Sequence, residues 1–144
     1  MAMHTWFECK IRYEKVMENG MQKKVTEPYL VDALSFTEAE ARIIEEMTPF
    51  ISGEFTVSDI KRANYSELFP SDEESADRWF KCKLIFITLD EKSGAEKKTS
   101  TQVLVQAADL RDAVKKLDEG MKGTMADYQI GMVSETPLMD VYPY

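Results

Sequence analysis

An internal repeat restricts the possible folds of this chain more than any other feature. Thr5–Tyr13 has the sequence TWFECKIRY, and Arg78–Phe86, 73 residues later, has the sequence RWFKCKLIF. Further matches follow in order at offsets of 73 or 74 residues, and they include Ala39 with Ala113, Ile43 with Leu117, Met47 with Met121, Phe55 with Tyr128, and Phe69-Pro70 with Tyr142-Pro143. This ordered series predicts a duplicated structural unit.

Each copy carries the same local signals. Phe7–Tyr13 alternates apolar with charged residues, the period of two that is typical of a half-buried strand. Asn19-Gly20 predicts a hairpin turn, and Ser35–Glu38 has the S-x-x-E form of a helix capping box. In the second copy, Lys92–Gly94 and Asp109 stand at the corresponding turn and helix start. Each copy is therefore expected to form a β-β-α-β unit.

These signals predict the α+β fold class, with two tandem β-β-α-β repeats related by pseudo-twofold symmetry and two helices packed on mainly antiparallel sheet. Residues 1–144 are expected to form a single domain, with repeats at about 5–70 and 78–144. The connector at 71–77 carries four acidic residues in seven, so it is expected to be solvated. Because neither copy alone offers much core, we expect both helices to share a common interior.

The composition excludes several classes of protein. The 144 residues carry a formal net charge of −8, which argues against a protein that coats DNA through a general positive charge. No apolar run approaches the roughly 18 residues that a membrane helix needs. The N-terminus lacks the apolar segment of a secretory signal. We therefore expect a cytoplasmic protein with no membrane partner.

Signals for catalysis and metal binding are sparse. Cys9 and Cys82 share their parity with the core residues, and we expect them to pack in the core instead of forming a redox pair or half a metal site. His4 is the one histidine, and no glycine-rich phosphate loop is present. We expect no catalytic residue, no metal and no cofactor. The alternative is an enzyme that uses carboxylates alone, such as the pair Asp59 and Glu67.

The two hairpin segments differ in charge from the rest of the chain. Residues 6–32 and 79–107 have net charges of 0 and +2, whereas 33–78 and 108–144 have net charges of −7 and −3. On the first strand of each copy, tryptophan and basic residues alternate with core residues, so they are expected on the opposite face of the sheet. The predicted ligand-binding residues are Trp6, Lys10, Arg12, Trp79, Lys81 and Lys83.

This arrangement favours a non-catalytic binding module for an anionic ligand, either single-stranded nucleic acid or a nucleotide, because indole rings stack on bases and lysines hold phosphates. Two alternatives stay open. Ile85, Ile87 and Leu89 continue the face of Trp79, so this face can be covered by the C-terminal segment or by the other copy. It can also be the interface of a homo-oligomeric protein–protein adaptor or inhibitor.

Two segments of the first copy, WFECKIRY and KKVTEPYLVDAxSFTEAEAR, resemble an uncharacterised family of short proteins of unknown function from gut Bacteroidetes and their phages. The resemblance extends over nearly the whole chain. It implies no catalytic or binding residue, because none is assigned in that family. It implies, by association, a phage, mobile-element or replication-associated setting.

Overall fold

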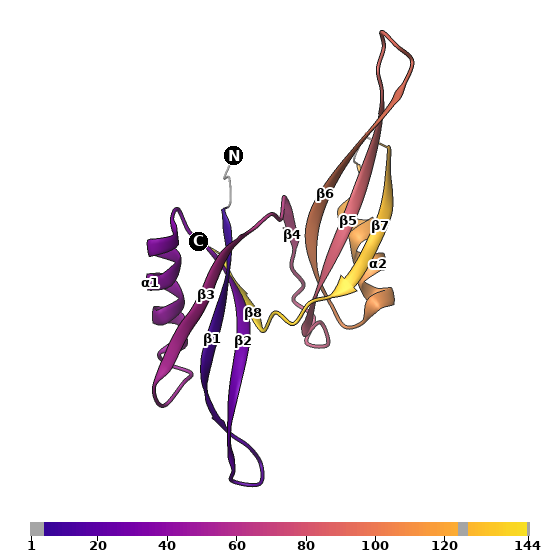
Figure 1. Cartoon of the computed structure of the whole chain (residues 1–144). Coiled ribbons are helices and arrows are strands. Elements are labelled where there is room, and N and C mark those ends of the chain that lie inside the picture. The colour runs from indigo at the N-terminus through magenta and orange to yellow at the C-terminus, as the bar shows by residue number, and fades with distance from the viewer. Residues whose placement is uncertain (1–4, 124–126, 144) are drawn as a thin grey trace. The chain divides into compact units, whose positions relative to one another are not determined.

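The computed structural model describes residues 5–123 and 127–143, so His4 and Tyr144 lie outside the described residues. The chain divides into two compact units, whose elements are labelled in Figure 1. Unit 1 comprises Met1–Asn64 together with Pro137–Tyr144, and unit 2 comprises Tyr65–Thr136. Within the described residues, each unit combines a helix with a four-stranded, mainly antiparallel sheet. The predicted α+β class is therefore confirmed.

Unit 1 is built on a long hairpin. Its two strands pair antiparallel along their whole length, and Gly20 takes a φ of 82° in the turn that Asn19-Gly20 predicts. The sheet order is β3-β1-β2-β8, and β8 pairs parallel with β2. The elements of unit 1 are β1 (Trp6–Val16), β2 (Gln22–Asp32), α1 (Phe36–Met47), β3 (Phe55–Ala63) and β8 (Asp140–Tyr142).

Unit 2 is built on a second long hairpin, in which Gly94 takes a φ of 70°. The sheet order is β4-β6-β5-β7, and β4 pairs parallel with β6. The elements of unit 2 are β4 (Glu67–Phe69), β5 (Arg78–Leu89), β6 (Glu96–Ala107), α2 (Leu110–Gly120) and β7 (Asp127–Glu135).

Each of the two short strands, β4 and β8, belongs to a different sheet from the strand that precedes it in the sequence. β4 follows β3 along the chain, yet it pairs with β6, from Glu67↔Val103 to Phe69↔Val105. β8 follows β7, yet it pairs with β2, from Tyr29↔Asp140 to Val31↔Tyr142. The units therefore do not coincide with the sequence segments 5–70 and 78–144, because each segment contributes its last strand to the other unit's sheet.

Each helix begins at its predicted cap. Ser35 Oγ accepts a hydrogen bond from the Glu38 backbone N–H at 3.1 Å, and Asp109 Oδ1 accepts one from the Asp112 N–H at 2.8 Å. These bonds satisfy backbone donors that a helix start leaves without an intrahelical partner. α1 and α2 each lie on one side of their own sheet (Figure 1).

The described residues form two hydrophobic clusters, one in each unit. In unit 1, Ala39, Ile43 and Met47 of α1 pack against the β1–β2 hairpin. In unit 2, Ala113 and Leu117 of α2 pack against the β5–β6 hairpin. The expectation of a common interior for both helices is therefore wrong, because each helix covers the apolar face of its own four-stranded sheet.

Cys9 and Cys82 are free thiols with 0% exposed surface, and each belongs to one of the two clusters. Burial, followed by the charges of Glu8 and Asp59, raises the pKa of Cys9 from 9.0 to about 12. Burial also raises the pKa of Cys82, to about 11. The two residues lie in the core as their parity predicts.

Both thiols are expected to resist a disulfide reagent at about pH 8 in the folded protein and to react in urea, because burial keeps them protonated and only the thiolate attacks. Absorbance of the released reagent measures both rates, and a thiol that reacts rapidly without urea would contradict this assignment.

The raised pKa values also make the stability of the fold depend on pH, because the folded state holds the thiol protons more tightly than the unfolded state does. Their stabilising effect is complete below pH 9.0 and is lost as the pH rises towards about 11 and 12.

Candidate functional site

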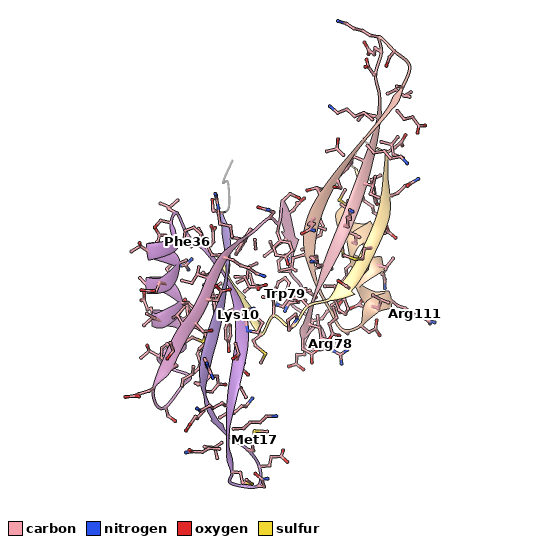
Figure 2. The ribbon with its side chains drawn as sticks, viewed as in Figure 1. Lys10, Met17, Phe36, Arg78, Trp79 and Arg111 are labelled. Atoms are coloured by element: carbon pink, nitrogen blue, oxygen red, sulfur yellow. The ribbon has the colours of Figure 1, made fainter. Side chains whose placement is uncertain are left out.

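The structure divides the six sequence-predicted site residues between the units. Trp6, Lys10 and Arg12 lie on β1, whereas Trp79, Lys81 and Lys83 lie on β5. In both strands they alternate with the residues of the helix-facing clusters, so they occupy the sheet face that points away from the helix. Figure 2 labels Lys10 and Trp79 on the two strands.

Burial separates the tryptophans from the basic residues. Trp6 and Trp79 retain 3% and 6% of their surface exposed, so neither indole offers a free ring face for stacking. Lys10, Lys81 and Lys83 are half-buried, and Arg12 is exposed. Strand parity predicts which face of the sheet a side chain occupies, but it does not predict what covers that face.

A groove lies in unit 1 where the β1–β2 hairpin extends beyond β3. The pairing of β1 with β3 ends at Tyr13↔Phe55, so the last residues of β1 have no strand beside them on that edge. The segment between α1 and β3 runs along this edge, leaving a groove of about 780 Å³. Its lining residues are Arg12, Tyr13, Glu14, Lys15, Val16, Gln22, Lys24, Phe50, Ile51, Ser52, Gly53, Glu54 and Thr56.

The groove combines cations with exposed apolar side chains. Three basic residues line it, Arg12, Lys15 and Lys24, against two acidic ones, so its lining carries a net positive charge in a chain of net charge −8. The ring of Phe50 is 76% exposed, and Val16 is 66% exposed. Met17, labelled beside the hairpin turn in Figure 2, adds a further exposed apolar side chain at this end of unit 1.

A hydrogen-bonded cluster connects the groove lining to the core. The Tyr13 hydroxyl donates to Glu27 Oε1 at 2.7 Å, the Tyr29 hydroxyl is 3.3 Å from the same oxygen, and Lys15 Nζ lies 3.8 Å from Glu27 Oε2. Burial, followed by the hydrogen bond to Glu27, raises the pKa of Tyr13 to about 12. The cluster therefore anchors two groove residues to β2.

The corresponding register positions of unit 2 are mostly apolar. Phe86, Thr101 and Val103 stand where unit 1 has Tyr13, Glu27 and Tyr29. Within the described residues, the anchored cationic groove is a property of unit 1.

Most of the groove does not follow from the sequence pattern. Of its three cations, Arg12 is among the predicted ligand-binding residues, whereas Lys15 and Lys24 are not. An available signal was the apolar pair Phe50-Ile51 directly after Pro49, because a connection between a helix and a strand is usually polar. No periodicity could show that this stretch lies beside the free edge of β1, because that placement follows from the length by which the hairpin exceeds β3.

Two other groups of polar residues are less suited to binding a ligand, because one is already ion-paired and the other is split between the two units. A smaller hollow of about 430 Å³ in unit 2 contains Lys116, whose Nζ lies 3.1 Å from Glu73 Oε2 and 3.0 Å from Asp112 Oδ2. The carboxylate pair Asp59 and Glu67 belongs to different units. In the part of the chain that the structure describes, no group of three His, Cys, Asp or Glu residues is arranged to hold a metal ion.

A protein-family model described as "Domain of unknown function (DUF4494)" matches residues 5–144. No curated protein and no solved structure matches the chain. Across residues 5–123 and 127–143, no helix is both long and apolar enough to span a membrane.

Proposed function

The chain belongs to the DUF4494 family, whose function is unknown, and we propose that it is a non-catalytic binding module for an anionic ligand, single-stranded nucleic acid or a nucleotide. The observation that carries the proposal is the unit 1 groove, whose lining includes three cations and the exposed side chain of Phe50. The proposal retains Arg12 from the predicted site and assigns the stacking role to Phe50, because Trp6 and Trp79 are buried.

The cations suit phosphate groups. Arg12, Lys15 and Lys24 line one groove, and guanidinium and ammonium groups form charge-assisted hydrogen bonds with phosphate oxygens. Glu14 and Glu54 leave the local excess of charge small, so affinity is expected to fall with salt in proportion to the few phosphates engaged.

The aromatic ring suits a base. Phe50 is 76% exposed, so a base can stack on it without displacing a core side chain. Stacking on an aromatic side chain contributes about 1–3 kcal/mol per base with little sequence preference. The groove volume of about 780 Å³ lies within the range of small-molecule sites and can accommodate a nucleotide or a short stretch of a single strand.

We propose further that the two units derive from one duplicated β-β-α-β segment with a short final strand, related by pseudo-twofold symmetry. The equal element order supports this, as do the partners of the short strands, since β8 pairs with Tyr29–Val31 and β4 pairs with Val103–Val105. These partner segments are 74 residues apart. A cytoplasmic setting in a phage or mobile element of gut Bacteroidetes belongs to the same proposal, on the basis of the sequence resemblance.

A titration followed by fluorescence anisotropy tests the groove, with a labelled oligodeoxythymidine and a labelled adenine nucleotide as probes at low salt. Arg12→Glu combined with Lys24→Glu is expected to weaken binding of the oligonucleotide about 10- to 100-fold, because two phosphate contacts become repulsive. Phe50→Ala is expected to weaken it about tenfold through loss of stacking.

Lys92→Glu is the matched control, because Lys92 lies in the hairpin turn of unit 2, and the substitution changes the net charge without touching the groove. The control should bind both probes like the unmodified chain. Failure of both probes to bind at low salt would refute the proposal, as would an equal loss in the control.

A homo-oligomeric adaptor or inhibitor is the second candidate. One specific observation favours it: the helix-free face of the unit 2 sheet carries exposed aliphatic side chains.

A further inference from the structure

The groove of unit 1 has the free edge of a strand along one side. β1 pairs with β3 only as far as Tyr13↔Phe55, and the hairpin continues beyond the end of β3 (Figure 1). Glu14 and Val16 follow this last pair, and both residues are exposed and line the groove. A ligand in the groove can therefore reach the backbone of β1 as well as its side chains.

The hydrogen-bond pattern of the hairpin determines which backbone groups point towards this free edge. The Met17 N–H donates to the Met21 carbonyl at 2.8 Å, so Met17 faces β2. Hydrogen-bonded and non-hydrogen-bonded pairs alternate along an antiparallel hairpin, so Val16 and Glu14 direct their N–H and C=O groups away from β2. In the part of the chain that the structure describes, no group hydrogen-bonds to these four backbone groups. Two donors and two acceptors are therefore available to a ligand.

The length of the free edge distinguishes between two kinds of ligand. A peptide that adds a strand to a sheet edge binds through a row of main-chain hydrogen bonds. Here β3 occupies the edge as far as Tyr13, and the hairpin turn begins at Met17, so only two outward-facing residues are free. They are about 7 Å apart, at about 3.3 Å per residue along the strand, which suits one planar group better than an added strand. The free edge therefore favours a nucleobase.

An unpaired base has the complementary hydrogen-bonding groups. Each of the four bases carries a donor beside an acceptor on its Watson–Crick edge, and in thymine these are the N3–H and O4. The Glu14 carbonyl can accept from such a donor, and the Val16 N–H can donate to the acceptor beside it. In a duplex the same atoms of the base are already paired. Proteins that recognise single strands bind unstacked bases in this way, with an aromatic side chain against the ring.

We infer that the free edge of β1 hydrogen-bonds to the Watson–Crick edge of an unpaired base, through the Glu14 carbonyl and the Val16 N–H. The inference rests on the proposed function, in which Phe50 provides the stacking surface and the three cations of the groove contact phosphates. It restricts the ligand to nucleotides and single strands whose base edge is free. Discrimination among the four bases is expected to be small, because each of them carries an adjacent donor and acceptor.

A probe with a blocked base edge tests the inference without any change to the protein. Oligodeoxythymidine methylated at N3 of every base keeps its phosphates and its stacking rings, but it loses the N3–H donor and carries a methyl group in its place. In fluorescence anisotropy at low salt, the full chain is expected to bind this probe about tenfold more weakly than unmodified oligodeoxythymidine. Equal affinity for the two probes would overturn the inference and leave the proposed function standing. Failure of both probes to bind would refute the proposed function and this inference with it.

Val16→Pro tests the protein side of the same contact. Proline removes the outward-facing N–H and no hydrogen bond to β2, and proline is tolerated at such edge positions. The variant is expected to bind unmodified oligodeoxythymidine about three- to tenfold more weakly and the methylated probe as before, so the affinity ratio of the two probes falls to about threefold or less. This ratio is not altered by a general loss of binding, which affects both probes alike.

Leu89→Pro is the matched control, because Leu89 holds in unit 2 the register position that Val16 holds in unit 1. Its affinity ratio should equal that of the unmodified chain. A ratio that Val16→Pro leaves unchanged, or that Leu89→Pro lowers equally, would overturn the inference. A labelled polyglutamate peptide that binds more tightly than oligodeoxythymidine and loses affinity in Val16→Pro would also overturn it, because the occupant of the free edge would then be a peptide.

Discussion

Replacing Phe80 by alanine is expected to lower the free energy of unfolding by about 3–5 kcal/mol, the cost typical of removing a buried aromatic ring. Phe80 is 2% exposed and belongs to the cluster that Leu117 and Ala113 of α2 form with the β5–β6 hairpin. The loss combines the transfer free energy of the ring with the cavity that it leaves. Since domains of this size are stable by about 5–15 kcal/mol, the variant should unfold at a much lower urea concentration.

Phe50→Ala is the control for this measurement. Its ring is 76% exposed, so the free energy of unfolding should change by less than about 0.5 kcal/mol, although ligand affinity is expected to fall. Urea unfolding followed by circular dichroism measures both variants. A loss below about 1 kcal/mol for Phe80→Ala would contradict a close-packed core around α2.

Phe69→Ala is expected to destabilise unit 2 by about 2–3 kcal/mol, although Phe69 follows β3 of unit 1 in the sequence. Phe69 packs on the α2 cluster, and its ring lies so close to Gly120 that a Cβ there would come within 2.9 Å. Removing the ring leaves β4 attached to β6 mainly by three parallel residue pairs. The expected result is faster amide hydrogen exchange in β6 and α2, with exchange in β2 and α1 unchanged.

The reciprocal variant is Tyr142→Ala, which removes a ring stacked on Tyr29 at a centroid distance of 6.1 Å. It should accelerate exchange in β2 of unit 1 and leave β6 unchanged. Met139→Ala, at a side chain that is 51% exposed just before β8, should affect neither. If Phe69→Ala instead accelerated amide hydrogen exchange in β2 and α1, this result would contradict the assignment of β4 to the sheet of unit 2.

Most of the local structure follows from short-range signals. Asn19-Gly20 forms the predicted turn, Ser35 and Asp109 cap the predicted helices, and Cys9 and Cys82 lie in the core as their parity predicts. Each of these features depends on residues within a few positions of one another, through a hydrogen bond, a positive φ or the alternation of a strand.

The composition of the candidate site follows less directly from the sequence than the local structure does. Parity assigns Trp6 and Trp79 to the helix-free face, but both residues are buried. The exposed aromatic residue of the groove is Phe50, which lies in a connecting segment. The cover of a sheet face and the neighbours of a loop depend on contacts between residues that are distant in sequence. No local pattern records those contacts.

The amino-acid order alone was sufficient for the two hairpins, the two helices, their caps and the face that each strand buries, because side-chain period and turn chemistry act over a few residues. The assignment of β4 and β8 to their sheets came from the folded chain. A three-residue strand has too short a pattern to specify its partner strand. The position of β4 depends on the packing of Phe69 against the α2 cluster beside β6, and the position of β8 depends on the stacking of Tyr142 on Tyr29 of β2.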